Sequence, residues 1–406
     1  MAGQAFSSDT EMKSLDSDAQ VGIVSWDYGE QARGGLGRAM AEMAICFCGT
    51  GLHLLARKIR TVSVFAPCSP VPQRTNHIVQ RLSRTIQCII DSRFLFIVRL
   101  FRGLQQWIDT HQIRTVILPT GPGGLFLVRK LKRCRLIVVC YHTYSQQARM
   151  VPGQWWKSVF IPLERRTFRL ADQVLCYSPD TECVLLQQYG VHRTKLTLLP
   201  QIFDVVAWHP RLPTKERGLC VCVARLDRRK GIDVLLRAWP SVVGTWSTAR
   251  LVIVGDGRGR THVLDFSAHH SSVRWIPSLP QEELVRLVQR AEIALCPSYL
   301  EGFGLACAEA MAAGTAVIAS DCDGLRSLVH HGETGWLVLS GDPVALTNGI
   351  TALLRDAVLR ERLMENAHVH ICRSFSRQES TQQFLATFRE SPVSSVSCVA
   401  GFCVRG

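Results

Sequence analysis

The sequence predicts an α/β protein of two facing, doubly wound, Rossmann-like domains, with the functional site in the cleft between them. Three observations lead to this expectation: a length of 406 residues, an alternation of short apolar runs with longer helical patterns, and a break near the middle of the chain. At roughly 150 residues per domain, this length suits about two domains. Apolar residues make up 47% and charged residues 20%, which is typical of globular proteins.

The apolar runs are continuous and bounded by turn residues, which is typical of parallel strands covered by helices on both faces. In the first half the predicted strands are 21–26, 61–66, 115–120, 136–141, 173–178 and 196–200. In the second half they are 219–225, 250–255, 273–277, 293–298 and 316–320. Ligands of such sheets bind beyond the carboxyl ends of the strands.

The break over 205–218 contains two prolines, several basic residues and no clear periodicity, so it is expected to be a linker. It divides the chain into an N-terminal Rossmann-like domain over 21–205 and a C-terminal Rossmann-like domain over 206–370. We further expect a disordered tail over 1–20, a helix over 371–392 that packs back on the first domain, and a tail over 393–406. The sequence shows no secretory signal and no membrane-spanning run, which favours a cytoplasmic protein.

The formal net charge of +14 favours anionic partners, such as phosphorylated substrates, an anionic membrane surface or nucleic acid. No acidic residue occurs between Glu42 and Asp91, and 129-RKLKRCR-135 is strongly basic. A solvated basic face explains the same pattern. No nucleic-acid-binding motif accompanies the charge, so nucleic acid is not an expected partner. The sixteen cysteines include no C-x-x-C pair, which favours buried apolar side chains over a metal site.

A first glycine cluster, 34-GGLG-37, follows the first predicted strand and precedes a predicted helix over 38–47. A glycine-rich turn at a helix N-terminus presents backbone N–H groups to an anion. The dinucleotide-binding fingerprint requires a third small residue where Met40 stands, and an acidic residue about 20 positions further on. Both are absent, so we do not expect this half to bind a nicotinamide cofactor.

Two further turns follow strands of the second half. In 225-RLDRRKG-231, Arg225 ends a strand and Lys230 precedes the glycine that opens the next helix. Two cations at the carboxyl end of a strand suit a diphosphate, although a charged surface turn is the simpler explanation of this segment alone. The turn in 251-LVIVGDGRG-259 allows close approach of backbone to a ligand, but by itself indicates only a strand-to-helix turn.

The most specific string is 297-PSYLEGFGLACAEAMAAG-314. If a helix begins near Phe303, Glu301 lies in the loop before it and Glu309 in its second turn. A carboxylate buried against this alanine-rich helix requires a partner, and a pair of sugar hydroxyls is a suitable one. Either glutamate alone is consistent with a surface acid, but the whole string is not.

Taken in order, these motifs resemble the family 4 (group 1) glycosyltransferases, which have the two-domain GT-B fold. The resemblance runs from Val21 to about Pro392. Its matching pieces are GGLGRA near the start, LERRTFRLADQVLCYS at 163–178, VARLDRRKGID at 223–233, IVGDG at 253–257, the E-x7-E string at 301–309 and HGETGWLV at 331–338.

The resemblance implies roles for residues that match the family's motifs. Arg225 and Lys230 would bind the donor diphosphate, and Glu301 would contact the transferred sugar. His142 matches a histidine near the donor sugar, although a packed histidine at a strand end is the alternative. The other donor-binding residues that it implies are Gly34, Gly35, Asp256, Phe303, Gly304, Leu305 and Glu309.

The implied reaction is a retaining, metal-independent transfer of a hexosyl group from a nucleoside-diphosphate sugar to an acceptor hydroxyl, in the synthesis of polysaccharides, glycolipids or glycoconjugates. No cofactor is expected beyond this co-substrate. The acceptor is a sugar, a lipid-linked molecule or a small molecule. The alternatives are a catalytically degenerate nucleotide-sugar binding module and a sugar-nucleotide epimerase of the same fold. A phosphorylase would require a pyridoxal lysine, and the length argues against it.

Three positions depart from the family pattern. Gln201 stands in a segment where Asn-Gly is usual, Thr143 where an acid is frequent, and Ser327 where a glutamate is common. These departures are the observations that keep the degenerate module open. Asp321-Cys322-Asp323 spells the D-x-D metal motif of the other large glycosyltransferase fold, but in this family the position is only a loop, so we expect no metal there.

The resemblance implies that the N-terminal domain binds the acceptor and the C-terminal domain the nucleotide-sugar donor. The N-terminal domain mixes apolar and basic residues over 78–108. In the same domain, Trp155-Trp156-Lys157 is a cluster typical of membrane interfaces. The sequence favours core helices with a basic outer face. A peripheral contact with the inner face of an anionic membrane is the alternative.

Overall fold

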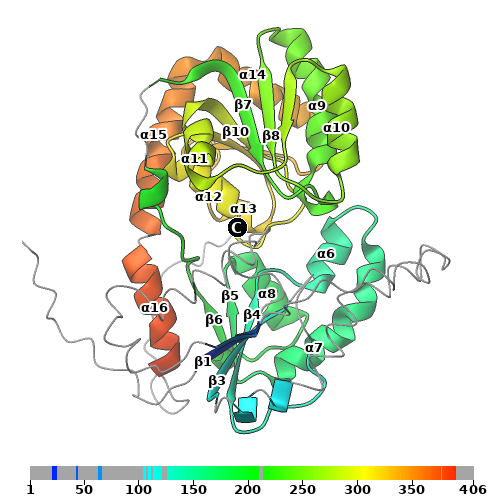
Figure 1. Ribbon diagram of the computed structural model, residues 1–406, viewed down its shortest axis with the longest axis vertical. Helices are drawn as coiled ribbons and strands as arrows, with labels where there is room; N and C mark the ends of the chain where they lie inside the picture. The colour runs from blue at the N-terminus through cyan, green and yellow to red at the C-terminus, as the bar shows by residue number, and fades with distance from the viewer. Residues whose placement is uncertain are drawn as a thin grey trace, which may run out of the picture.

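The computed structural model describes residues 21–24, 43, 63–65, 104–106, 108–110, 113–120, 126–209, 214–375 and 377–389. Within these residues the chain forms two parallel six-stranded sheets, each with helices packed around it (Figure 1). The predicted α/β fold class with two doubly wound domains is thereby confirmed.

The sheet of the first domain has the strand order β2-β1-β3-β4-β5-β6 among the described residues. Its strands are β1 Val21–Val24, β2 Ser63–Phe65, β3 Thr115–Thr120, β4 Arg135–Cys140, β5 Gln173–Cys176 and β6 Leu196–Leu198. Its described helices include α6 Tyr144–Met150, the 3₁₀ helix η3 Trp155–Phe160, α7 Ile161–Leu170 and α8 Pro179–Gln187.

The sheet of the second domain has the order β12-β11-β10-β7-β8-β9. Its strands are β7 Glu216–Val223, β8 Arg250–Val254, β9 Val273–Ile276, β10 Ala291–Cys296, β11 Ala316–Ser320 and β12 Trp336–Val338. The helices are α9 Ile232–Thr245, α10 Arg260–His269, α11 Gln281–Arg290, α12 Leu305–Ala312, α13 Asp323–Arg326, α14 Pro343–Arg355 and α15 Ala357–Ser374.

The strand order of the second sheet reverses between β7 and β10. The chain passes from β7 to β8 and β9 on one side, and then returns to place β10 on the other side of β7. Connections on opposite sides of the sheet leave a crevice at such a switch point, where ligands of doubly wound sheets bind. This topology therefore predicts a site beyond the carboxyl ends of β7 and β10.

The predicted linker is packed against the second domain where the structure describes it. The 3₁₀ helix η5, Val206–Trp208, buries the Trp208 side chain, and Gln289 Nε2 donates to the carbonyl of His209 at 2.8 Å. Strand β7 already begins at Glu216. The junction is thus held by burial and hydrogen bonds.

The helix expected over 371–392 begins differently in the structure. Helix α15 ends at Ser374, and a separate helix α16, Arg377–Arg389, lies beside the sheet of the first domain (Figure 1). Phe375 leaves the helical conformation, and its ring packs between Phe203 and Phe303, with centroids 6.1 Å and 5.2 Å away. Aromatic packing at the domain junction therefore accounts for the break.

Among the described helices, none has the length and apolar character that crossing a bilayer requires.

Candidate active site

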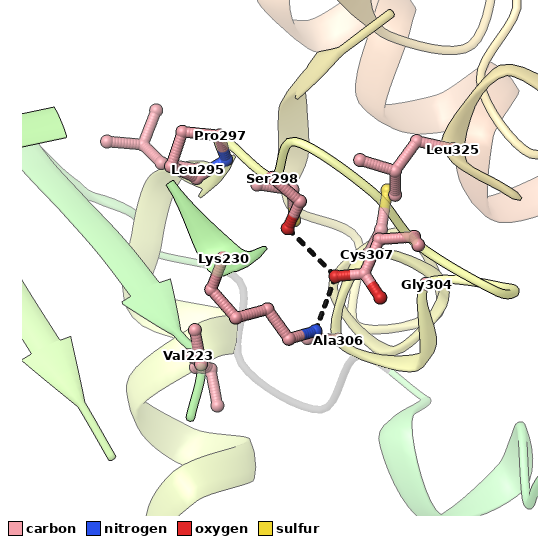
Figure 2. A pocket seen from close by; sticks show the side chains of 12 residues that line it. Val223, Lys230, Leu295, Pro297, Ser298, Gly304, Ala306, Cys307 and Leu325 are labelled. Atoms are coloured by element: carbon pink, nitrogen blue, oxygen red, sulfur yellow. Dashed lines mark hydrogen bonds and ion pairs between the residues drawn. The ribbon is translucent and has the colours of Figure 1, made fainter. Parts of the chain in front are cut away.

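A pocket lies at the switch point of the second sheet (Figure 2). It is lined by Val223 and Ala224 at the end of β7 and by 295–298 at the end of β10. The other residues that line it are Lys230, Glu301, Gly304, Ala306, Cys307 and Leu325. Topology and side chains therefore indicate the same position for a ligand.

The turn after β7 is fixed by a cap and a glycine. Asp227 accepts a hydrogen bond from Arg229 N at 3.1 Å and caps the 3₁₀ helix η6, Arg228–Lys230. Gly231 then adopts φ 62°, and a Cβ atom there would lie 1.8 Å from the Pro297 carbonyl oxygen. Only glycine allows η6 to pack so closely on the loop after β10. The turn thus sets the position of Lys230.

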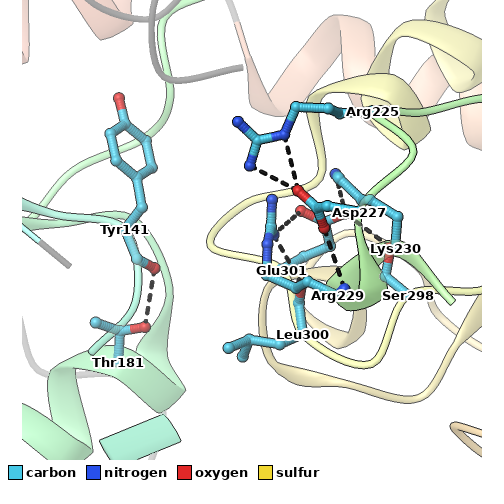
Figure 3. A network of polar contacts seen from close by, with 9 residues as sticks. All are labelled: Tyr141, Thr181, Arg225, Asp227, Arg229, Lys230, Ser298, Leu300 and Glu301. Atoms are coloured by element: carbon cyan, nitrogen blue, oxygen red, sulfur yellow. Dashed lines mark hydrogen bonds and ion pairs between the residues drawn. The ribbon is translucent and has the colours of Figure 1, made fainter. Parts of the chain in front are cut away.

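Glu301 is the centre of a buried polar network (Figure 3). Its side chain accepts hydrogen bonds from Ser298 Oγ at 2.8 Å and Arg229 Nη1 at 3.1 Å, and it forms an ion pair with Lys230. Arg229 also donates to the carbonyl of Leu300 at 2.9 Å. Burial raises the pKa of the Glu301 carboxyl, but Lys230 and Arg229 outweigh this effect and lower it to about 2. Glu301 is therefore a fixed carboxylate at neutral pH.

Arg225 lies at the edge of this network. Its guanidinium forms an ion pair with Asp227, with Nη2 2.6 Å and Nε 2.8 Å from Oδ2. Burial raises the pKa of Asp227, but Arg229, Arg225 and Lys230 more than offset this and lower it to about 2. A guanidinium carries five donor hydrogens, more than this carboxylate takes up. Arg225, whose side chain is 40% exposed, can therefore also bind a second anion.

Helix α12 begins directly beside the pocket. Gly304 precedes it with φ 100°, and a Cβ atom there would lie 2.6 Å from Leu325 Cδ2. The helix begins at Leu305, so Glu309 lies in its second turn, and the Glu309 side chain is buried. The Phe303 ring packs against Phe203 with centroids 6.4 Å apart, and neither Phe303, Leu305 nor Glu309 is among the residues that line this pocket.

The glycine-rich turn after β8 packs against the turn after β7. A Cβ atom on Gly255 would lie 1.9 Å from the Ala224 carbonyl oxygen, so the two turns pack backbone to backbone. Asp256 Oδ1 accepts from Gly257 N at 2.8 Å, and Asp256 O accepts from Leu226 N at 3.0 Å. These contacts of Asp256 are with the turns themselves, and Asp256 is not among the residues that line the pocket.

His142 approaches the site from the first domain. It follows β4, and its neighbour Tyr141 has a carbonyl oxygen that would lie 2.6 Å from a Cβ atom on Gly302. Both ring nitrogens of His142 are buried without a hydrogen-bond partner within the described structure. Burial and the positive charge of Arg229 hold the His142 pKa well below its usual range. The neutral ring offers one donor and one acceptor to a ligand.

The structure brings Lys230, Glu301 and Gly304 into one pocket, with Arg225 and His142 near it. Gly34 and Gly35 lie outside the described residues. Asp227, Arg229 and Ser298 were not predicted from sequence, although all three shape this network. Only Asp227 carried a usable signal, because an Asp at the start of a helical turn is typical of an N-cap.

The departures from the family pattern have local explanations in part. Thr143 caps α6, since its hydroxyl accepts from Gln146 N and its own N–H donates to Gln146 Oε1 at 2.8 Å. Ser327 Oγ donates to the Gly324 carbonyl at 2.8 Å. Gln201 is buried and donates to the Ile202 carbonyl at 3.0 Å, and its Oε1 has no described partner.

The D-x-D string does not form a pair of convergent carboxylates. Asp321 Oδ1 accepts from Arg326 Nε at 2.5 Å, whereas Asp323 Oδ2 accepts from Gln146 Nε2 at 2.6 Å across the domain junction. Within the described residues, no group of three or more His, Cys, Asp or Glu side chains is arranged to hold a metal ion.

A second pocket, of about 300 Å³, lies between the two domains. Its lining is mainly apolar and aromatic, and consists of Tyr177, Pro179, Leu198, Leu199, Pro200, Phe303, Ser327 and Phe375. Both domains contribute to it, so the cleft contains an apolar region beside the charged network.

Two family descriptions match consecutive parts of the chain. Residues 51–206 match "Glycosyltransferase Family 4", and residues 207–370 match "Glycosyl transferases group 1". The two matches meet inside η5, which is the junction between the domains.

Among curated proteins, a phosphatidyl-myo-inositol mannosyltransferase of Mycobacterium leprae is 36% identical over 175 residues, or 43% of this chain and 45% of that protein. The chain spans about half the length of the curated relatives it matches. Sucrose-phosphate synthase from Thermosynechococcus elongatus has a similar structure, with a TM-score of 0.73 at 21% identity and coverage of 91% of this chain and 98% of that one. Anabaena HepE in complex with UDP and glucose gives a TM-score of 0.65 at 16% identity, with coverage of 91% and 99%.

These structural likenesses show the fold, and the family matches cover both of its domains. The chain therefore belongs to the group 1, family 4 glycosyltransferases, with the GT-B fold.

Proposed function

We propose that this chain is a retaining hexosyltransferase, which moves a sugar from a nucleoside-diphosphate sugar to an acceptor hydroxyl. The observation that carries the proposal is the network of Glu301 with Lys230 and Arg229 at the switch point of the second sheet. It combines fixed cations for a diphosphate with a fixed carboxylate for sugar hydroxyls, and it belongs to a chain of this family.

Arg225 and Lys230 are the proposed ligands of the diphosphate. Each charge-assisted hydrogen bond contributes about 1.5–3 kcal/mol. Both cations pair with carboxylates, Asp227 and Glu301, which hold them in place before the donor arrives. The diphosphate would share these cations, and no metal ion is needed if they neutralise the leaving group.

Glu301 and the backbone of Phe303 and Gly304 would bind the transferred sugar, and Glu309 would bind the nucleotide ribose. The neutral His142 ring would hydrogen-bond a sugar hydroxyl from the opposite domain. The remaining donor contacts are assigned by resemblance to Gly34, Gly35, Asp256 and Leu305.

In the proposed reaction, the bond between the anomeric carbon and the diphosphate oxygen breaks while the acceptor oxygen bonds to the same carbon from the same face. The proton of the acceptor hydroxyl passes to the departing diphosphate. Cations that interact more strongly with this developing charge than with the bound donor lower the barrier. If about 3 kcal/mol of this interaction appears only in the transition state, its loss slows the reaction roughly a hundredfold.

The relatives suggest which substrates to test first. HepE binds UDP and glucose, so uridine nucleotides lead the donor series. The mycobacterial relative is named for a phosphatidylinositol acceptor, so inositol phosphates and inositol lipids lead the acceptor series.

The test is thermal unfolding with UDP, GDP and ADP, each with and without EDTA. A ligand that binds only the folded state adds about 2.7 kcal/mol at a hundred times Kd. We expect a stabilising shift with one nucleotide that survives EDTA and is lost in Arg225→Ala. The control is Arg286→Ala, which removes an exposed cation paired with Glu282 on α11.

The nucleotide that stabilises the protein then defines the sugar series for a transfer assay, in which product anomericity is read by NMR. Inversion would disprove the retaining mechanism, and a shift abolished by EDTA would disprove metal independence. Nucleotide binding with no transfer to any acceptor would favour a non-catalytic binding module, for which Gln201, Thr143 and Ser327 are the motivating departures.

A further inference from the structure

Helices η3 and α7 expose three apolar side chains within nine residues. Trp155 is 74% exposed, Val159 63% and Leu163 38%. The segment is anchored from its other side, where the Phe160 ring stacks on Phe126 with centroids 5.9 Å apart. Single exposed apolar side chains are ordinary on a protein surface. A group of them that includes a largely exposed tryptophan indicates a contact surface.

The surroundings of these side chains are strongly basic. Residues 126–170 contain ten Lys or Arg residues and a single acid, Glu164, which is buried. The loop after Phe126 lies along α7, since Leu127 N donates to Thr167 Oγ1 at 2.9 Å and Arg166 Nε donates to Val128 O at 3.3 Å. The two segments are therefore neighbours, and both carry exposed cations close to the apolar side chains of η3 and α7; Lys130 among them pairs with Asp172 at 3.1 Å. The exposed ones are Arg129, Lys130, Lys132, Arg133, Arg166 and Arg169.

We propose that this face, hereafter the Trp155 surface, binds an anionic lipid bilayer. Its apolar members Trp155, Val159 and Leu163 would enter the headgroup region, and its cations would contact anionic lipids. Exposed apolar side chains surrounded by Lys and Arg are the features that bind proteins peripherally to such membranes. Tryptophan is enriched at the interface because its ring is apolar and its N–H remains hydrogen-bonded.

The Trp155 surface begins at the edge of the domain cleft. Val151 is buried among core residues of the second domain, and a Cβ atom on Gly153 would lie 3.0 Å from Arg228 Nη1. Arg228 opens η6, the turn that ends with Lys230. A bilayer on the Trp155 surface would therefore adjoin the cleft, and an acceptor held in that bilayer would reach it without crossing bulk water.

Nucleic acid is the other anionic polymer that binds exposed tryptophan and cations, through stacking of bases on aromatic rings. Val159 and Leu163 are aliphatic and offer no such stacking. They favour a bilayer, which accepts any apolar side chain.

The test is vesicle flotation with the full chain. We expect binding to vesicles of phosphatidylcholine with about one third phosphatidylglycerol, and weak binding to phosphatidylcholine alone, because each cation near an anionic surface contributes separately. Arg129→Glu/Lys132→Glu/Arg169→Glu should reduce partitioning at least about tenfold. Trp155→Ser/Val159→Ser/Leu163→Ser should cause a similar loss at unchanged charge.

Matched controls change other parts of the surface. Arg286→Glu/Arg362→Glu/Arg373→Glu alters the net charge equally on the second domain, and Leu339→Ser/Val344→Ser/Val358→Ser removes three apolar side chains there that are each at least 65% exposed. Both controls should float like the wild type. Circular dichroism melting establishes that each variant is folded.

Equal binding of the wild type and both Trp155-surface variants would overturn the proposal, as would absence of binding to anionic vesicles. Binding of an oligonucleotide, but not of vesicles, through the same residues would replace it with a nucleic-acid surface. Flotation involves no sugar transfer, so its result stands whether or not the proposed transferase activity is found.

Discussion

Gln146 of the first domain donates a hydrogen bond to Asp323 of the second domain, with 2.6 Å between Nε2 and Oδ2. The two residues are 177 positions apart in the sequence. Burial, and then the nearby Asp180, raise the Asp323 pKa above its ordinary value. The contact therefore joins the domains through a carboxyl group that resists ionisation.

Gln146→Glu should weaken this junction. The new carboxylate can still accept from Thr143 N within α6, but it faces Asp323 with a like charge. We expect a loss of about 1–2 kcal/mol in the free energy of unfolding, the scale of an unfavourable buried charge contact. The loss should shrink at acid pH, where the raised pKa keeps Asp323 neutral. Urea denaturation at two pH values measures it, and adding Asp323→Asn should restore stability; an unrestored double variant would contradict the assignment.

Gly231→Ala should displace η6 and so disrupt the site. The position has φ 62°, and the added Cβ would lie 1.8 Å from the Pro297 carbonyl, so η6 must move away from β10. We expect a loss of about 3 kcal/mol or more in stability, together with loss of nucleotide binding. Gly190→Ala is the matched control, because Gly190 has φ 66° with nothing within 4 Å of its Cβ position. That control should lose only about 1–2 kcal/mol, from the backbone conformation alone; an equal loss in both variants would show that the carbonyl contact is unimportant.

Arg229→Ala should destabilise the protein as well as the site. It leaves the buried Glu301 carboxylate with one cation, Lys230, and removes the hydrogen bond to Leu300 O. Breaking a buried pair typically costs about 3–5 kcal/mol, and the remaining partner places this variant near the lower end. Chemical denaturation measures the loss. Arg228→Ala, which changes the exposed neighbour in the same turn, should stay within about 0.5 kcal/mol of the wild type.

Glu164 should make the free energy of unfolding depend on pH. Burial raises the pKa of its carboxyl to about 8, although Tyr189 and the Tyr144 N–H donate to it and act in the opposite direction. The folded state thus retains a proton that the unfolded state releases near 4.5. Stability from this group is fully present below pH 4.5 and is lost as the pH rises through about 8. Glu164→Gln should remove most of this slope, and denaturation curves from pH 5 to 9 would reveal a slope that persists.

Central strands such as β11 could be predicted because they are continuous apolar runs buried on both faces, and all five β11 residues are buried. Strand β12, Trp336–Val338, was not predicted, since it is short and only Val338 in it is buried. The site was predicted as a set of residues but not as a network. In 228-RRK-230, three adjacent cations carry no signal that Arg229, as well as Lys230, contacts Glu301. The choice of Arg229 depends on the contact of Gly231 with Pro297, which is tertiary. The break at Phe375 was missed for the same reason, since nothing in 371–389 ends a helix locally.

The burial of Val151 restrains motion between the two domains. This side chain belongs to the first domain but is 1% exposed within the apolar cluster of the second. Any motion that separates the domains must draw it into water, at a cost of roughly 1.5–3 kcal/mol. This cost favours the arrangement in which the two domains remain in contact. Exchange of the proposed nucleotide ligand through the cleft would then require this side chain to leave its cluster.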